Sequence, residues 1–315
     1  MANWHWVDRG DQMDVLGHVV ARHEVDHPGS LPDLRRCAKL CAAIDWGGLD
    51  DSTQFSSLAV LLADDHCCET WCQLRQQVRQ QCLPDGRRLS DKTLSDRVRQ
   101  RALPAFLVAA DEIPGLLFTV LVDRQIRTLT SEPDLPARVD FAGAVFGRDD
   151  YRRLETTVQF VGFLLAGLSK AGQPGQVLLD EDNIVANRAQ QSAVCKAFSL
   201  AMKDRLPHML GAWTVSDAAC ARDRLLVEDL LAVVDLAAGA LADLASNEPH
   251  LHDRPAGGDV PADPSALKRK TRAILSWLGL ADRALKRLAL VIRRDRDDER
   301  FVTAQIVNVA TSPPV

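Results

Sequence analysis

The chain has 315 residues, of which 46% are hydrophobic and 26% are charged, and its formal net charge is −5. This balance is typical of a globular protein with a sizeable core and excludes a disordered or fibrous chain. Its apolar runs fall short of the roughly 18 to 20 residues that cross a bilayer, and its start lacks the basic flank and apolar segment of a secretion signal. We therefore expect a cytoplasmic protein with no membrane partner. Its eight cysteines, two of them adjacent, indicate reduced thiols rather than a disulfide framework.

The first third of the chain predicts an N-terminal helical extension over residues 1–40, followed by a β-hairpin. Helical patterns over 13–25 and 31–43 lie on either side of a Pro28-Gly29 break. A short apolar strand over 43–48 then ends in two glycines, and the apolar run 57–62 predicts its hairpin partner.

The middle of the chain alternates helical and strand patterns. Helices are predicted over 69–82, from Ser90 or Ser95 to 108, over 151–168 and over 187–203, and strands over 115–122, 176–180 and 210–216. Residues 225–244 are almost uniformly apolar, which predicts a buried helix. Residues 247–265 are typical of a linker, and 266–315 predict a C-terminal helix and β-hairpin. The order indicates a mixed α/β protein with a core over 41–246.

Three aspartates occupy positions that suggest a metal site. Asp45 ends the first strand and is followed by glycines, which would let a metal or phosphate approach closely. Asp180 ends the fourth strand, and Asp235 interrupts the apolar face of the buried helix, where an unpaired carboxylate is costly. Mg²⁺ or Mn²⁺ would satisfy all three. The alternative is that Asp45 and Asp180 cap turns or helices and that Asp235 pairs with a buried arginine.

The order of these elements resembles the ribonuclease H-like superfamily and, within it, the domain-of-unknown-function family number 3800. The similar segments are the strand 43–48 with its acid, the helix 230–240 around Asp235, and three strands between them, followed or ended by Asp123, Asp180 and Asp217. The resemblance covers about residues 40–246 and implies a ribonuclease H-like mixed five-stranded sheet with flanking helices.

The resemblance also implies a function. It is that of a metal-dependent nuclease, in which Asp45 bridges two Mg²⁺ or Mn²⁺ ions, Asp180 and Asp235 complete the ligands, Asp217 is a further candidate, and water attacks a phosphodiester of DNA or RNA. A role in bacterial antiviral defence or mobile-element biology is a further expectation. One acid usual after the first strand of that family is absent here unless Asp50 or Asp51 replaces it. The alternative function is therefore a catalytically inactive scaffold that docks onto a protein partner through its N- or C-terminal extension.

Other motifs offer weaker candidates. Because the chain is acidic overall, nucleic acid would need local basic patches; the candidates are Arg75 with Arg79, the group Arg87, Arg88, Arg97, Arg99 and Arg101, and the run Lys268, Arg269, Lys270 with Arg272. Each of them also fits a solvated helix face. Zinc could be held by two Cys/His groups that lack the spacing of a zinc ribbon: His66, Cys67, Cys68 and Cys72, and His23, His27, Cys37 and Cys41. Trp46, beside Asp45, could stack on a base, although a core or rim position fits it as well.

Overall fold

The computed structural model describes residues 3–48, 53–65, 69–126, 135–180, 184–217, 224–248, 267–294 and 302–306. Its helices are α1 (Met13–Asp26), α2 (Glu69–Cys82), α3 (Arg97–Ala110), α4 (Arg148–Leu168), α5 (Arg188–Arg205), α6 (Arg224–Asn247) and α7 (Arg269–Leu278), with short 3-10 turns η1 (Leu34–Arg36) and η2 (Asp91–Thr93). Its strands are β1 (Leu40–Gly47), β2 (Phe55–Asp64), β3 (Gly115–Asp123), β4 (Arg138–Phe141), β5 (Ala144–Gly147), β6 (Gly175–Leu179), β7 (Trp213–Asp217), β8 (Leu285–Arg294) and β9 (Val302–Ile306).

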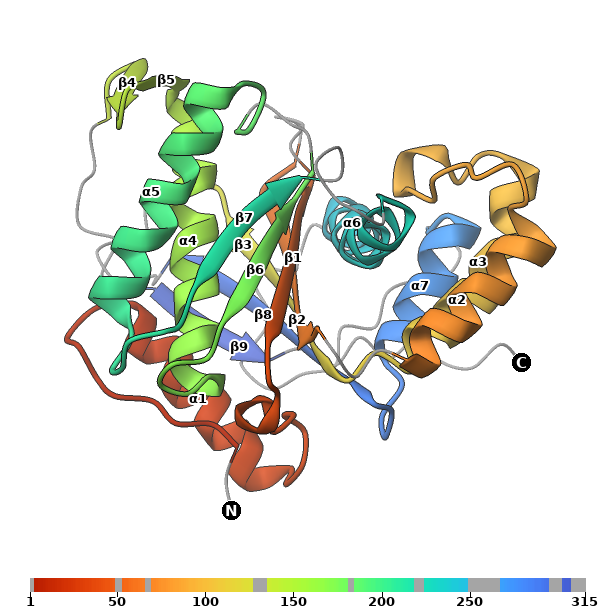
Figure 1. Cartoon of the computed structure of the whole chain (residues 1–315), viewed down its shortest axis with the longest axis horizontal. Helices are drawn as coiled ribbons and strands as arrows, with labels where there is room; N and C mark the ends of the chain where they lie inside the picture. Colours follow the sequence, from red (N-terminus) through yellow and green to blue (C-terminus); the bar gives the residue numbers. More distant parts are fainter. Residues whose placement is uncertain are drawn as a thin grey trace.

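A mixed sheet of seven strands in the order β7-β6-β1-β2-β3-β8-β9 forms the centre of the fold (Figure 1). β1, β2 and β3 are antiparallel neighbours, while β6 pairs parallel to β1 and β7 parallel to β6. These five strands are the predicted core strands, and the arrangement is compatible with a ribonuclease H-like fold. The predicted number of five is wrong for the whole sheet, because β8 pairs parallel to β3 and β9 pairs antiparallel to β8.

The two added strands come from the segment predicted as a C-terminal extension. β8 pairs with β3 over most of its length, so this segment contributes to the main sheet. Most of the predicted linker 247–265 lies outside the described residues. A small hairpin of β4 and β5, which the sequence patterns did not predict, turns at Ala142 and Gly143. Both turn residues have positive φ, as expected for a two-residue hairpin turn.

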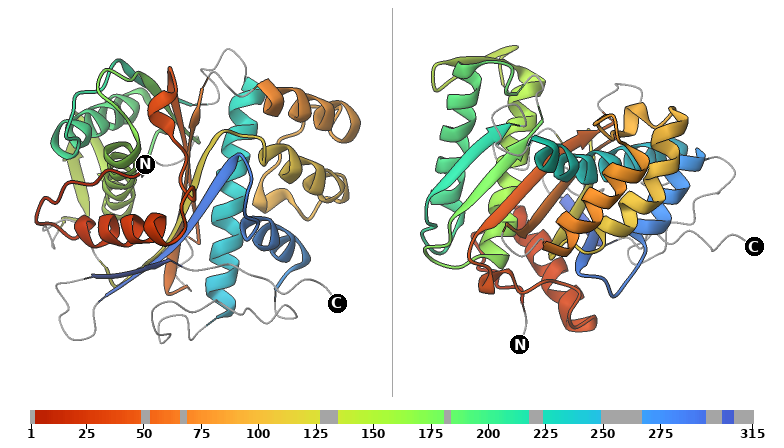
Figure 2. Two further views of the ribbon diagram at one scale, coloured as in Figure 1. Left: turned by 90° about the horizontal axis from the view of Figure 1, so that it is seen from below. Right: turned by 45° about the vertical axis from the view of Figure 1, so that its right-hand side comes forward.

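Helices cover both faces of the sheet (Figure 1), and the side chains of β1 alternate between the core clusters on the two faces. Ala42 and Ile44 belong to the core cluster with α1, α4 and α5, whereas Cys41 and Ala43 belong to the cluster with α6, α2, α3 and α7. Because side chains alternate along a strand, Asp45 is placed on the α6 face. Figure 2 shows α2, α3 and α7 side by side beyond α6.

The predicted helix over 31–43 is wrong. Only the three residues of η1 form a helical turn there, and the chain is already a strand at Leu40. Leu40 pairs with Asp64 of β2 and with Gly175 of β6, so β1 is an inner strand with neighbours on both sides. This double pairing outweighs the helical preference of the Leu- and Ala-containing segment.

Helix α6 is buried, as its composition predicted. It packs across β1, β2 and β3, and its partner helix α7 lies beside it. Near its start, Asp229 is fully buried and forms ion pairs with Arg75 and Arg79 of α2. These pairs fix α2 against α6. None of the helices in the described part of the chain is both long enough and apolar enough to cross a membrane.

Candidate functional site

Asp45 lies near the carboxyl end of β1 and is half-buried on the face covered by α6. Its Oδ1 accepts the amide of Trp46 at 2.8 Å. Trp46 itself points to the opposite face, where its indole Nε1 donates to Thr157 of α4 at 3.0 Å. Stacking of Trp46 on a base bound at the acidic site is therefore not favoured by this placement.

The two glycines after Asp45 make room for helix α6. A Cβ at Gly47 would lie 2.6 Å from the carbonyl oxygen of Ala238, and Gly48 has a φ of +64°. The close approach predicted from these glycines is therefore made by the backbone of α6. This contact brings the middle of α6 to the end of β1.

Asp235 is the α6 residue that meets Asp45. It is half-buried in a run of buried neighbours, and the two carboxyls are joined by a hydrogen bond. The backbone amide of Asp91 in η2 donates a second hydrogen bond to Asp235 Oδ2. Thus the prediction that a carboxylate at this position needs a partner is met by another carboxyl and by a backbone N–H.

Asp180 follows β6 directly, at the same end of the sheet as Asp45, because β6 runs parallel to β1. Its carboxylate forms a two-point ion pair with Arg88, in which Nη1 lies 3.0 Å from Oδ1 and Nη2 donates to Oδ2. The side chains of Arg88 and Asp180 are 33% and 28% exposed, so the pair remains accessible to solvent. The structure therefore brings the three predicted acids to one site and adds an arginine to it.

The electrostatics show that the acids lie close together. Burial raises the pKa of Asp45 well above its ordinary value, and the charge of Asp235 raises it further, with a smaller contribution from Asp180. Burial also raises the pKa of Asp235, although the Asp91 amide and the hydrogen bond from Asp45 oppose this. These shifts favour a protonated Asp45 carboxyl that donates a hydrogen bond to the Asp235 carboxylate, because two ionised carboxylates cannot share a hydrogen bond.

Arg88 belongs to the connection between α2 and α3, and two other arginines hold the backbone of that connection. Arg79 Nη1 donates to the carbonyl of Arg87 at 2.8 Å, and Arg99 Nε donates to the carbonyl of Arg88 at 2.7 Å. Arg79 is itself fixed by the buried Asp229. The guanidinium of Arg88 is therefore aimed at the acids by a fixed main chain.

Two further residues belong to the site: Asp91, which the sequence analysis did not predict, and Lys270, which it named only as part of a basic run that could bind nucleic acid. Lys270 Nζ on α7 lies 2.7 Å from both the carbonyl oxygen and Oδ2 of Asp91. A Cβ at Gly239 of α6 would lie 2.5 Å from Asp91 Cγ, so this glycine lets η2 approach α6. Asp91 carried no sequence signal because it lies in a polar loop, and the basic run around Lys270 did not indicate that this lysine would bind an acid of the site.

Of the other predicted acids, Asp123 caps a turn and the rest have side chains outside the described residues. Asp217 ends β7 at the same level as Leu179, but its side chain lies outside the described residues, as do Asp50 and Asp51. Asp123 is buried at the end of β3 and accepts the amide of Gln125 at 2.9 Å, as a turn cap does. Asp217 stays a prediction.

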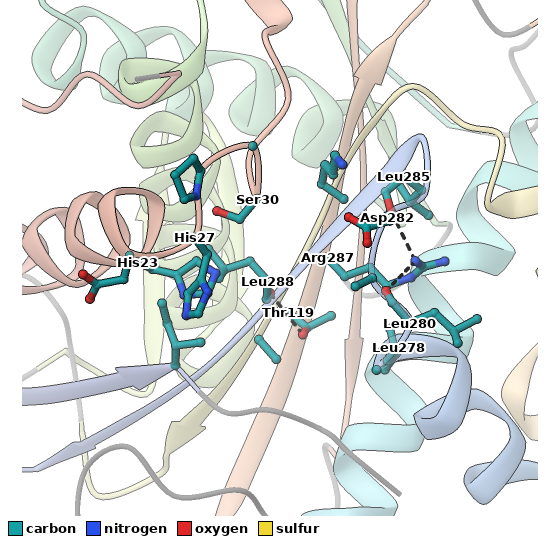
Figure 3. Close-up of a pocket in the computed structure, with 18 residues that line it drawn as sticks. His23, His27, Ser30, Thr119, Leu278, Leu280, Asp282, Leu285, Arg287 and Leu288 are labelled. Carbon is teal, nitrogen blue, oxygen red and sulfur yellow. Dashed lines mark hydrogen bonds between the residues drawn. The ribbon is translucent and has the colours of Figure 1, made fainter. Parts of the chain in front are cut away.

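The proposed zinc ligands are not assembled in the described residues. Cys37 and Cys41 belong to core clusters on opposite faces of the sheet, and His66, Cys67 and Cys68 lie outside the described residues. The rings of His23 and His27 lie tilted against each other, with centroids 4.7 Å apart, beside a cavity of about 640 Å³ between α1 and β8 (Figure 3). Burial, and then the neighbouring His27, lowers the pKa of His23. This cavity contains none of the acids of the site.

The donor chemistry of the acidic site fits a divalent metal. Its hydrogen bonds and ion pairs join four carboxyls to two cations; the members are Asp45, Asp91, Asp180, Asp235, Arg88 and Lys270. With every group ionised, the cluster carries an excess of two negative charges, and the raised pKa of Asp45 shows how protonation relieves it. A divalent cation with oxygen ligands would relieve it equally. In the described residues, no three His, Cys, Asp or Glu side chains are already arranged to hold an ion.

Comparisons with known proteins give a limited result. No protein-family model and no curated protein matches the sequence. Among solved structures, the ribonuclease H2 from Pyrococcus horikoshii OT3 is similar with a TM-score of 0.33 and 14% sequence identity, over 76% of this chain and 85% of that chain. The narrower resemblance to the domain-of-unknown-function family number 3800 therefore stays a prediction.

Proposed function

We propose that this protein is a metal-dependent nuclease that hydrolyses phosphodiester bonds of DNA or RNA. The observation that carries the proposal is the meeting of Asp45, Asp180 and Asp235 at one end of the sheet, where Asp45 and Asp235 share a hydrogen bond. These acids come from β1, the end of β6 and α6, and the fold alone brings them together. A role in antiviral defence or mobile-element biology is part of the same proposal.

Asp45, Asp180 and Asp235 would hold Mg²⁺ or Mn²⁺, with Asp217 on the neighbouring strand as a further ligand. Two such ions, when bound, stabilise the attacking and leaving oxygens of a phosphodiester. The chain itself supplies Arg88, whose guanidinium forms two parallel hydrogen bonds to a carboxylate and can form the same pair with a phosphate. Arg88 would then leave Asp180 and position the substrate.

A specific observation favours a second function, that of a catalytically inactive scaffold. The two-point ion pair of Arg88 with Asp180 and the hydrogen bond between Asp45 and Asp235 already give each carboxyl a partner without metal. A site satisfied in this way can serve to hold β1, β6 and α6 together. Under this function, the protein would act by docking onto a partner through residues 1–40 or 266–315.

Cleavage assays separate the two functions. Labelled single- and double-stranded DNA and RNA are incubated with Mg²⁺ or Mn²⁺ and with the wild type, Asp45→Asn or the control Asp149→Asn, whose side chain is 91% exposed. We expect metal-dependent cleavage by the wild type and the control, and none by Asp45→Asn. Cleavage that survives in Asp45→Asn would place the activity elsewhere, and no cleavage by any variant on any substrate would favour the scaffold.

A further inference from the structure

The basic residues singled out in the sequence, together with the neighbouring Lys92, fall into two sets. One set is held by internal carboxylates and makes these pairs: Arg75 and Arg79 with Asp229, Arg87 and Arg99 with Asp96, Arg88 with Asp180, Lys268 with Asp243, and Lys270 with Asp91. These residues stabilise the protein or the acidic site. They are therefore not free to bind a polyanion at the same time.

The second set consists of exposed cations that make no ion pair with any residue in the described ranges: Lys92 of η2, Arg97 and Arg101 of α3, and Arg269 and Arg272 of α7. We call these five residues the cationic surface. Its members come from two stretches of the chain, residues 92–101 and 269–272, that are far apart in the sequence. Whether they form one surface depends on how α3 and α7 lie.

Helices α3 and α7 pack against each other and run in the same direction (Figures 1 and 2). At their carboxyl ends, the amide of Leu285 after α7 donates to the carbonyl of Asp111 after α3 at 3.0 Å. After these helices, α3 leads into β3 and α7 leads into β8, and the two strands are parallel neighbours. At the other end, Lys270 in the first turn of α7 binds Asp91 of η2, just before α3.

The amino ends of both helices therefore lie beside the acidic site. The backbone amide of Asp91 donates a hydrogen bond to Asp235. A series of contacts therefore connects Lys270 through Asp91 to the acids. Lys92 follows Asp91 in the sequence, and Arg269 precedes Lys270. Two members of the cationic surface thus flank the contact that reaches the site.

The first turns of α3 and α7 contain cations and no acid. Arg97 and Arg99 begin α3, and Arg269 and Lys270 begin α7. The positive end of a helix dipole disfavours cations and favours anions, so the charges of these residues do not stabilise the helices through the dipole. At α3 the helix end is already capped by Asp96, whose side chain accepts the amide of Val98, so an external anion there would be attracted by the exposed side chains. At α7, which has no side-chain cap, the helix end would attract the anion as well.

We propose that the cationic surface binds the phosphodiester backbone of a nucleic acid strand and leads it to the acidic site. The inference rests on the proposed function, because it names the route by which that function's substrate arrives. Since the chain carries a net charge of −5, a polyanion needs such a local concentration of cations to bind at all. Binding through phosphates predicts little sequence preference and a strong dependence on salt.

The test measures binding without cleavage. Asp45→Asn protein in EDTA is titrated into fluorescently labelled single- and double-stranded DNA and RNA, and anisotropy is followed at several salt concentrations. Arg97→Gln/Arg269→Gln is added to this background as the test variant. Arg138→Gln/Arg188→Gln is the control, because it removes the same charge from exposed positions on β4 and α5, on the other side of the sheet.

We expect the test variant to bind about 10-fold more weakly and its plot of log affinity against log salt to be shallower by about 0.7 to 0.9 for each arginine that contacts a phosphate. The control should match the Asp45→Asn parent. Equal weakening in both variants, or a parent that binds none of the nucleic acids, would overturn the proposal. Because neither metal nor catalysis enters this assay, loss of the nuclease proposal and loss of the binding proposal are separate results.

Discussion

The carboxyls of Asp45 on β1 and Asp235 on α6 meet in a hydrogen bond, and the raised pKa of Asp45 favours Asp45 as its protonated donor. The contact exists because Gly47 lets the backbone of α6 approach β1. Under the proposed function, the stability of the metal-free fold and the binding of metal make opposite demands on this contact. A protonated pair stabilises the fold without metal, whereas a metal site needs both carboxylates ionised.

The first prediction concerns pH. Folding raises the pKa of Asp45 above its ordinary value of 3.8, so the wild type loses stability as the pH rises from there through the folded pKa. Asp45→Asn keeps a donor for Asp235 but has no proton to lose. We measure the free energy of unfolding of both proteins by urea denaturation in EDTA. The value for Asp45→Asn minus that for the wild type should increase by roughly 1.4 kcal/mol for each pH unit across this range. A pH-independent difference would contradict the shared proton.

The second prediction concerns Arg88, whose guanidinium competes with any cation for Asp180. Arg88→Met should lower the melting temperature without metal, because the acids lose a counter-charge. Mn²⁺ should then raise the melting temperature of Arg88→Met more than that of the wild type, consistent with an affinity about 10-fold higher. Arg87→Met is the control, since Arg87 pairs with Asp85 and Asp96 instead. An equal Mn²⁺ response in the variant and the wild type would show that Arg88 does not compete.

The third prediction concerns the buried ion pairs between α6 and α2. Asp229 is fully buried and pairs with Arg75 and Arg79, so Asp229→Asn leaves two arginines without their counter-charge. We expect the free energy of unfolding to fall by about 3 to 5 kcal/mol. Asp26→Asn, which breaks an exposed pair with Arg22, should change it by less than about 1 kcal/mol. Urea denaturation measures both changes. Equal losses in the two variants would contradict the claim that the buried ion pairs of Asp229 stabilise the protein more than the exposed pair does.

The fourth prediction concerns Gly239 of α6. Replacing glycine by alanine inside a helix normally stabilises it by about 1 kcal/mol, but a Cβ here would lie 2.5 Å from Asp91 Cγ. Gly239→Ala should therefore destabilise the protein by about 1 to 3 kcal/mol and displace η2 from Asp235. Gly162→Ala is the control, because its Cβ meets only the flexible side chain of Arg205 at 3.3 Å. Thermal unfolding of the two variants should differ in sign; stabilisation of Gly239→Ala would contradict the close packing.

Periodicity and composition predicted most of the elements. The strand patterns around 57–62, 115–122 and 176–180 were confirmed, as were the helices at 69–82, 151–168 and 187–203. The strands are apolar runs buried on both faces of the sheet, and the helices pack their apolar side chains against the core. The segment 31–43 failed because its helical preference is weak and its pairing partners lie far away in the sequence. The count of five strands failed because the last two were assigned to a separate hairpin.

The sequence by itself determined that Asp45, Asp180 and Asp235 would end or interrupt apolar elements, since a carboxylate at such a place stands out against its neighbours. Only the tertiary structure decided that these acids meet, that Arg88 binds Asp180, and that Asp91 and Lys270 complete the cluster. The reason is physical. Hydrophobic periodicity is a local property of the chain, whereas the partner of a charge is set by the crossing of β1, β6, α6 and η2, which no local pattern encodes.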